Sequence, residues 1–403
     1  MTQSEHGAAE QFRASVEIWR DPAHCLAFMK GRVALYAILR TLGIGEGDEI
    51  LVPGFTCVVV PAAIAYTGAT PVYYDINPVS LQGAPELATA AITGRTRAII
   101  IQHNFGAIAP LGNLPAICQQ RGIAIIEDCA HSMGAMIDNK PVGTLGTAAF
   151  CSLQWSKPTT TGLGGIARFN DRGLADSAKK LMDAEFAEPP LPRSACLWML
   201  SSLYRTWYRP SWYWTARMMY HWASRRGLIP GSSSPSELAC EALPDGYRER
   251  FGKLRFPDLD AALRDLPDLL LHRRLIHSFY AHRIAQWDVW KPAPEAPGAI
   301  GVALRFPLLA EDREELLATA RRHRLEIGDW FNAPLHPRGS LPGAFGYRKN
   351  SCPVAEAAAS RAVNLPTHRH VGIKEAEQVL RLVSQHGRLT SVSEWEATTG
   401  FSS

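Results

Sequence analysis

Short apolar runs alternate with helical patterns between residues 31 and 170, and this alternation limits the possible folds more than any other feature. Apolar residues at three-to-four spacing predict helices at 31–42, 85–91 and 111–120. The apolar runs predict strands at 49–53, 71–76, 97–103, 123–128, 148–153 and 164–169. Continuous apolar strands separated by helices are typical of a mostly parallel sheet covered on both faces. We therefore expect an α/β fold.

The length of 403 residues predicts two packed domains, because a single core stops growing at about 250–300 residues. Beyond residue 255 the pattern indicates amphipathic helices around a strand at 302–309, which is typical of a smaller α/β domain. We expect a polar N-terminal arm at 1–27, a large domain at 28–185, an aromatic and arginine-rich insertion at 186–254, and the small domain at 255–403.

Composition excludes several classes of protein. Hydrophobic residues make up 46% and charged residues 20%, which argues against a disordered chain. The net charge of +4 is too small to indicate a nucleic-acid partner. The eight cysteines form no C-x-x-C pair, so we expect reduced thiols in a cytoplasmic protein. The N-terminus lacks the apolar core of a signal peptide.

Polar residues mark the ends of the predicted strands, where parallel sheets place their sites. Asp128 ends one strand, and Ser152 ends another, five residues before Lys157 in a Thr- and Gly-rich loop. Arg32 follows Gly31 at the start of the first helix, where free N–H groups attract anions. A lysine, an acid, a hydroxyl and an anion cradle suit pyridoxal 5′-phosphate (PLP). That cofactor needs an amine for a Schiff base, an acid at the pyridine nitrogen and donors for the phosphate.

Each of these residues also has an ordinary structural interpretation. Asp128 alone is compatible with a helix cap, Lys157 with a solvated loop lysine, and Ser152 with an unremarkable strand position. Other cofactors have less support: no G-x-G-x-x-G follows the first strand and no P-loop is present. We expect no metal, because the His-rich stretch 368–370 has no second cluster at ligand spacing.

The chain resembles the DegT/DnrJ/StrS family of PLP-dependent sugar aminotransferases over residues 28–170 and 255–385. The resemblance rests on several motifs in one order. They include GRVALYAIL (31–39), IIEDCAHSMGA (125–135), VGTLGTAAFCSLQWSKPTTTGLGG (142–165) and SCPVAEAAASRAVNLPTHRHV (351–371). It implies the fold type I architecture and a homodimer with active sites at the interface.

The resemblance also implies roles for single residues. Lys157 would form the Schiff base and carry the proton, and Asp128 would pair with the pyridine nitrogen. Ala130 would pack on a face of the ring and His131 would bind the ring hydroxyl. The phosphate would be held by Ser152 and by the backbone amides that follow Gly31, those of Arg32 and Val33.

This chain departs from the family pattern at four positions. Arg32 replaces the usual Thr or Ser, and Cys57 stands where an aromatic residue stacks on the ring, with Phe55 or Phe105 as candidates to compensate. Lys253 aligns near an Asn that reaches in from the partner subunit, and Leu163 replaces a common Glu. His336 is a further candidate for substrate binding.

We therefore predict a transaminase that moves an amino group from glutamate to a keto sugar, nucleotide-linked, in amino-sugar, polysaccharide or secondary-metabolite biosynthesis. One alternative is a PLP-binding relative that does not transaminate, either dehydratase-like or regulatory. Another is a protein that binds a membrane surface or a partner through residues 196–226. That segment holds nine aromatic residues, five arginines and no acid, which is typical either of a buried interface or of peripheral membrane contact.

Overall fold

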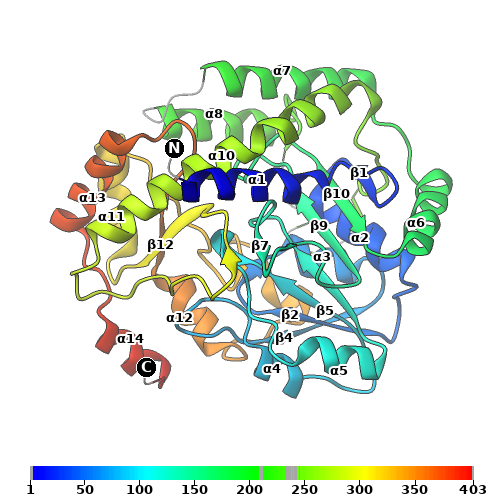
Figure 1. Ribbon diagram of the computed structural model, residues 1–403, viewed down its shortest axis with the longest axis horizontal. Coiled ribbons are helices and arrows are strands. Elements are labelled where there is room, and N and C mark those ends of the chain that lie inside the picture. Colours follow the sequence, from blue (N-terminus) through cyan, green and yellow to red (C-terminus); the bar gives the residue numbers. More distant parts are fainter. Residues whose placement is uncertain are drawn as a thin grey trace.

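A seven-stranded sheet forms the centre of the molecule (Figure 1), with strand order β1-β10-β9-β6-β5-β2-β4. The computed structural model describes residues 3–207, 212–231, 237, 239, 243–244 and 246–401. The strands are β1 (Cys25–Phe28), β2 (Glu49–Pro53), β4 (Thr70–Tyr74), β5 (Thr96–Gln102), β6 (Ala124–Asp128), β9 (Ala148–Ser152) and β10 (Gly165–Phe169). Strands β4, β2, β5, β6 and β9 are parallel, and β10 and β1 add an antiparallel edge. The predicted α/β class is confirmed.

Helices cover both faces of this sheet, which explains why consecutive residues in the middle of its strands are apolar. Ile50 and Val52 of β2 share a buried cluster with α2 (Gly31–Thr41) and α6 (Arg172–Glu185). Leu51, between them, belongs to a second cluster with Leu114 and Cys118 of α5 (Leu114–Arg121) and with Ala88 of α4 (Pro85–Ala90). Successive side chains of a strand therefore pack into the two cores on opposite faces of the sheet.

The N-terminal segment differs from the polar arm that we expected. Residues Gln3–Glu17 form helix α1, which lies along the long helix α10 (Phe256–Arg283) in Figure 1. Phe12, Val16 and Trp19 recur on one side of this segment and are buried in a cluster with Leu266 of α10. Cys25–Phe28 then enters the central sheet as β1. The segment has a narrow apolar stripe, which its polar composition obscured.

The C-terminal third has a smaller sheet of its own. Strands β12 (Arg305–Leu309) and β14 (Ala362–Pro366) are antiparallel, and they share a buried cluster with α10, α11 (Arg313–Arg322) and α13 (Ile373–His386). Helix α12 (Pro353–Arg361) precedes β14, and α14 (Val392–Thr399) lies near the C-terminus. These elements match the predicted helices and strand. The domain boundaries at residues 185 and 254 stay a prediction.

Two helices occupy the aromatic and arginine-rich segment, α7 (Leu191–Trp207) and α8 (Tyr213–Arg225), and both run along the upper edge of Figure 1. Pro210, which we expected to separate two helices, lies outside the described residues. Leu197 and Ser201 of α7 are buried, whereas Trp198 and Met199 are about half exposed. Within the described ranges, no helix has both the length and the apolar character needed to cross a bilayer.

Candidate active site

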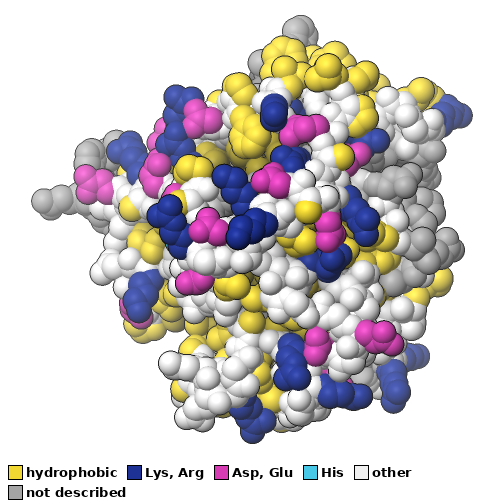
Figure 2. Space-filling model, turned by 90° about the vertical axis from the view of Figure 1, so that its right-hand side faces the viewer, with side chains coloured by type: hydrophobic (Ala, Val, Ile, Leu, Met, Phe, Trp, Pro, Cys, Tyr) yellow, Lys and Arg dark blue, Asp and Glu magenta, His cyan; other side chains and the backbone are white. Residues whose placement is uncertain are grey.

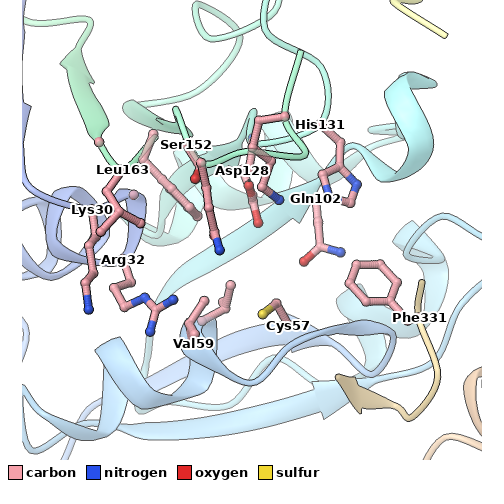
Figure 3. Close-up of a pocket in the computed structure, with 17 residues that line it drawn as sticks. Lys30, Arg32, Cys57, Val59, Gln102, Asp128, His131, Ser152, Leu163 and Phe331 are labelled. Atoms are coloured by element: carbon pink, nitrogen blue, oxygen red, sulfur yellow. The ribbon is translucent and has the colours of Figure 1, made fainter. Parts of the chain in front are cut away.

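A pocket opens where several strands of the central sheet end (Figure 3), with a volume of about 650 Å³ when the space open to solvent is included. Gln102, Asp128 and Ser152 are the last residues of β5, β6 and β9, and Gly31 begins α2 beside them. This is the edge at which parallel sheets bind ligands. The lining residues are Lys30, Gly31, Arg32, Cys57, Val59, Val60, Gln102, Asp128, Ala130, His131, Phe150, Ser152, Gln154, Lys157, Leu163, Gly164 and Phe331.

Two glycines let α2 begin directly against the strand ends. A Cβ on Gly31 would lie 2.9 Å from the Cβ of Ser152 and 3.0 Å from the carbonyl oxygen of Cys151. A Cβ on Gly165 would approach the backbone of Gly31 to 2.4 Å. No larger residue fits at either position without moving backbone. The packing brings the Ser152 side chain beside the first turn of α2, which is the arrangement an anion site requires.

Asp128 presents a buried carboxylate to the pocket. Its Oδ1 accepts a hydrogen bond from the backbone N–H of Ala130 at 2.9 Å, which orients the group. Burial raises the pKa of Asp128, although this N–H and the nearby Lys157 and His103 act to lower it. A cation facing this carboxylate would relieve the cost of burial, and a protonated pyridine nitrogen is such a cation.

His131 is a neutral imidazole whose proton can be assigned to one ring nitrogen. The backbone N–H of Phe105 donates to its Nδ1 at 3.3 Å. Burial holds the pKa of His131 well below its usual value, and the charges of Lys157 and Arg305 act in the same direction. A neutral ring that accepts at Nδ1 carries its proton on Nε2. His131 therefore supplies one N–H donor, and its ring stacks on Trp330 with 5.0 Å between centroids.

The amine of Lys157 lies inside the pocket, with its Nζ 4.5 Å from the centroid of the Trp330 ring. Burial lowers the pKa of Lys157 to about 8, against the opposing effects of Cys57 and Asp128. Near neutral pH an amine of this kind exists in both protonation states. Desolvation is one way in which proteins activate a lysine for covalent attachment and for proton transfer.

Arg32 and Lys30 place two cations at the N-terminus of α2. Figure 3 shows them across the pocket from His131 and Gln102. Nη1 of Arg32 lies 2.5 Å from Oε1 of Glu237, and both side chains are buried. Burial lowers the pKa of Lys30 to about 8, and Arg32 acts in the same direction. Two cations beside a helix N-terminus favour an anionic ligand at this end.

The aromatic wall of the pocket differs from our expectation. Cys57 lines the pocket, but Phe55 and Phe105 do not. They pack against each other, with 6.2 Å between ring centroids, and both contact Phe331. Phe331 does line the pocket, and its ring stacks on His131 at 5.7 Å. An aromatic residue is therefore present, but the C-terminal part of the chain supplies it.

Three of the predicted site residues lie outside the lining. The N–H of Val33 donates to the carbonyl of Lys30 at 3.1 Å, and its side chain is in the core. Lys253 is exposed, and its N–H donates to Glu188. The contact of Lys253 with a partner subunit stays a prediction. His336 does not line the pocket but neighbours a residue that does. It pairs with Cys57 where β13 (Leu335–His336) runs parallel to β3 (Thr56–Cys57).

The residues in the pocket fit PLP. A buried amine, a buried acid, a histidine donor and an anion cradle with a serine share one cavity, and these are the groups that hold and activate this cofactor. The predicted residues that the structure brings together are Gly31, Arg32, Cys57, Asp128, Ala130, His131, Ser152 and Lys157.

Sequence reasoning missed several residues of this site, among them Lys30, Gln102 and Phe331 in the lining, and Glu237, which pairs with Arg32 without lining the pocket. Gln102 had a usable signal, because it is the second-last residue of the predicted strand 97–103, which ends at the same sheet edge as Asp128. Lys30 also had one, because it directly precedes the glycine at the helix start. Phe331 and Glu237 had none, since tertiary packing brings them to the pocket from distant segments.

Comparison with known proteins points to one family. The sequence model of the DegT/DnrJ/EryC1/StrS aminotransferase family matches residues 4–189 and 249–384. The two matched ranges contain all the predicted pocket residues. The interval between them contains Glu237 and the helices α7 and α8.

Individual relatives agree with this match. An L-glutamine:2-deoxy-scyllo-inosose aminotransferase of Micromonospora echinospora is 35% identical over 179 residues, or 44% of this chain and 43% of that protein. The chain thus spans less than half the length of this relative. A pleiotropic regulatory protein of Geobacillus stearothermophilus is 25% identical over 94% of this chain and 89% of its own. The solved structure of S. venezuelae DesV has a TM-score of 0.69 at 23% identity, covers 96% of this chain and 89% of its own, and shares the fold.

Proposed function

The chain belongs to the DegT/DnrJ/EryC1/StrS aminotransferase family, and from this premise we propose that it is a PLP-dependent aminotransferase acting on a keto sugar. The observation that carries the proposal is the convergence of Lys157, Asp128 and the anion cradle of α2 in one pocket. We propose glutamate as the amino donor and a nucleotide-linked keto sugar as the acceptor. Both substrates would use the pocket in turn, as in ping-pong kinetics.

The side chains divide the chemistry between them. PLP, when bound, supplies an electron sink for negative charge at the substrate carbon. Lys157 takes up and returns the proton at that carbon, because its amine changes protonation state near neutral pH. Asp128 holds the proton on the ring nitrogen, and His131 donates from Nε2 to the ring oxygen. Leu163 and Val59 line the same pocket with apolar surface, which limits access of water.

Separate half-reactions test this function. The purified protein is loaded with PLP and mixed with glutamate or glutamine alone, and the cofactor spectrum is followed. It is then offered a nucleotide-linked keto-hexose or an inosose, and the aminated product is identified by mass spectrometry. We expect glutamate and the nucleotide-linked sugar to react. Turnover only with glutamine and the inosose, the substrates in the names of several relatives, would keep the enzyme class and replace both substrates.

The same experiment distinguishes the non-transaminating alternative. The Geobacillus stearothermophilus relative is named a regulatory protein, so we keep the hypothesis that this chain binds the cofactor without turnover. The presence of Lys157 supports transamination, because by resemblance the related dehydratases carry histidine at this position. A PLP spectrum that no amino donor changes would favour the alternative.

A second candidate function is contact with an anionic membrane surface. Each of the two helices α7 and α8 carries exposed apolar residues at helical spacing. On α7 these are Leu191, Trp198, Met199 and Leu203, and on or next to α8 they are Trp212, Met218, Met219 and Trp222. Figure 2 shows hydrophobic side chains gathered at the upper end of the molecule, where Figure 1 places α7. The segment 191–228 contains six arginines and no acid, which complements anionic lipid.

Vesicle co-sedimentation separates this candidate from a protein interface. We expect the protein to bind vesicles that contain phosphatidylglycerol and to ignore pure phosphatidylcholine, and Trp198→Ala with Trp222→Ala to abolish binding. Leu87→Ala, which removes an exposed leucine of α4, is the matched control. The homodimer that we propose by resemblance is measured in parallel by sedimentation velocity. A weaker dimer in the double variant, without vesicle binding by the parent, would assign this face to the subunit interface.

A further inference from the structure

The ion pair between Arg32 and Glu237 joins a part of the chain that the family model matches to a part that it does not. Arg32 lies in the matched range 4–189, at the N-terminus of α2, and Glu237 lies in the interval that the family model leaves unmatched. Their side chains are 6% and 1% exposed, and Nη1 lies 2.5 Å from Oε1. By resemblance, a neutral Thr or Ser is usual at the position of Arg32. This chain therefore replaces one neutral group with a pair of opposite charges.

A buried arginine at a helix N-terminus needs an anion. The helix dipole disfavours a cation there, and burial removes the solvation of the guanidinium. Burial acts to lower the pKa of Arg32, but Glu237 and Tyr247 raise it above the ordinary value. Glu237 therefore keeps this arginine charged in the absence of any ligand.

The same arginine lines the end of the pocket that suits a phosphate, together with Lys30 and Ser152. We propose that Glu237 competes with the cofactor phosphate for Arg32 and thereby lowers the affinity of the pocket for PLP. This inference rests on the proposed function. Arg32 and Lys30 bring two positive charges, and Glu237 cancels one of them. Glu237 does not line the pocket itself, but it contacts Arg32, which does. A dianionic phosphate bound at Arg32 would therefore have the carboxylate of Glu237 nearby as a like charge in a buried setting.

The first experiment compares PLP with pyridoxal, which has the same ring and no phosphate. Both are titrated into apo-protein in a buffer free of phosphate, and the cofactor absorbance gives each dissociation constant. We expect Glu237→Gln to bind PLP about tenfold more tightly, since one buried like charge is removed, and to bind pyridoxal as the parent does. Unchanged or weaker PLP binding in this variant would overturn the proposal.

Glu185→Gln is the matched control. Glu185 pairs with Arg40 at 2.8 Å, so it is the partner of the arginine at the opposite end of the same helix α2. Like Glu237, it does not line the pocket, but its partner Arg40 does not line the pocket either, whereas Arg32 does. Its substitution should leave both dissociation constants unchanged. If Glu185→Gln also lowered the dissociation constant of PLP, removal of any acid near α2 would have this effect, and a specific role for Glu237 would be contradicted.

A double-mutant cycle keeps the test informative if Glu237→Gln is unstable. Arg32→Thr alone leaves the buried carboxylate of Glu237 without its cation near the phosphate end, and we expect PLP binding to weaken by about a hundredfold. Arg32→Thr with Glu237→Gln restores a neutral site and should recover at least tenfold of that loss. A double variant that binds as weakly as Arg32→Thr would show that Glu237 does not act on the phosphate.

These outcomes are separable from a failure of the proposed function. If the parent protein binds no PLP and forms no covalent adduct at Lys157, the assignment of the cofactor pocket fails. If the parent binds PLP at Lys157 but neither the single variant nor the cycle responds, only the role of Glu237 fails.

Discussion

The two ends of the pocket are built in different ways. At the ring end, Asp128 is the last residue of β6, and Ala130 and His131 follow within three residues. Backbone N–H groups of Ala130 and Phe105 orient the side chains of Asp128 and His131. At the phosphate end, the groups come from the start of α2, the end of β9 and the segment before residue 249. One end is a local motif, and the other is an assembly of distant segments.

Because of this difference, a family match predicts the residue roles at the ring end but not all of those at the phosphate end. The ring end lies wholly in the matched ranges, so its chemistry is expected to be that of the family. The phosphate end also has one buried acid from outside those ranges, Glu237, on which the family match carries no information. Substitutions at the two ends, and at the lysine between them, test this difference.

The largest effect is expected for Lys157→Ala. The variant loses the amine that transfers the proton, so turnover should fall by at least about 10²–10⁴-fold. Borohydride reduction followed by peptide mass spectrometry should find no cofactor adduct. Lys30→Ala is the control, because burial lowers the pKa of Lys30 to about 8 as it does for Lys157. An adduct that persists in Lys157→Ala and disappears in Lys30→Ala would move the attachment to the phosphate end.

Asp128→Asn tests the ring end. An amide cannot favour the protonated pyridine nitrogen as an opposite charge does, and such a charge shifts a pKa by about 1–3 units. We expect kcat to fall roughly 10- to 1000-fold, with PLP still bound. Steady-state kinetics and a PLP titration provide both quantities. If the variant binds PLP more weakly but has a normal kcat when saturated with PLP, then Asp128 contributes to cofactor binding and not to the chemistry.

Burial of the Lys157 amine should also appear as a pH-dependent stability of the apo-protein. Its pKa is 10.5 in the unfolded chain and about 8 in the folded one. The unfolded state therefore binds more protons between these values, and stability rises with pH in that window. Relative to Lys157→Met, the free energy of unfolding should rise by about 3 kcal/mol from pH 8 to pH 10.5. Urea titrations at several pH values measure this difference, and parallel curves would place the amine in solvent.

The alternating pattern predicted six of the seven strands of the central sheet, because strands buried on both faces appear as continuous apolar runs, and it missed only β1. It failed for α1, where Phe12, Val16 and Trp19 form a narrow stripe in a polar segment. For the ring end, the rule that sites follow strand ends identified Asp128 directly. No such rule reaches Glu237 or Phe331, because their approach to the pocket depends on how distant segments pack.

Gly31→Ala acts on the phosphate end through packing alone. The new Cβ would lie 2.9 Å from Ser152, so either α2 or β9 must move. Overpacking of this kind costs about 1–3 kcal/mol, and we expect PLP to bind more weakly while pyridoxal binds normally. Gly94→Ala is the control, since a Cβ there meets nothing within 4 Å. Equal loss of PLP and pyridoxal in Gly31→Ala would mean that the disturbance reaches the ring end.

The smallest effect is expected at the ring end, for His131→Phe. Phenylalanine preserves the stacking on Trp330, at 5.0 Å in the parent, but removes the donor at Nε2. A neutral hydrogen bond contributes about 0.5–1.5 kcal/mol, so the PLP dissociation constant should rise roughly two- to tenfold. A PLP analogue without the ring hydroxyl has nothing to accept this bond, and parent and variant should bind it equally. Because burial holds the pKa of His131 well below its usual value, the difference should not change between pH 6 and pH 8. A variant that discriminates equally against PLP and the analogue would show that His131 supports the pocket by packing and not by donating to the ring.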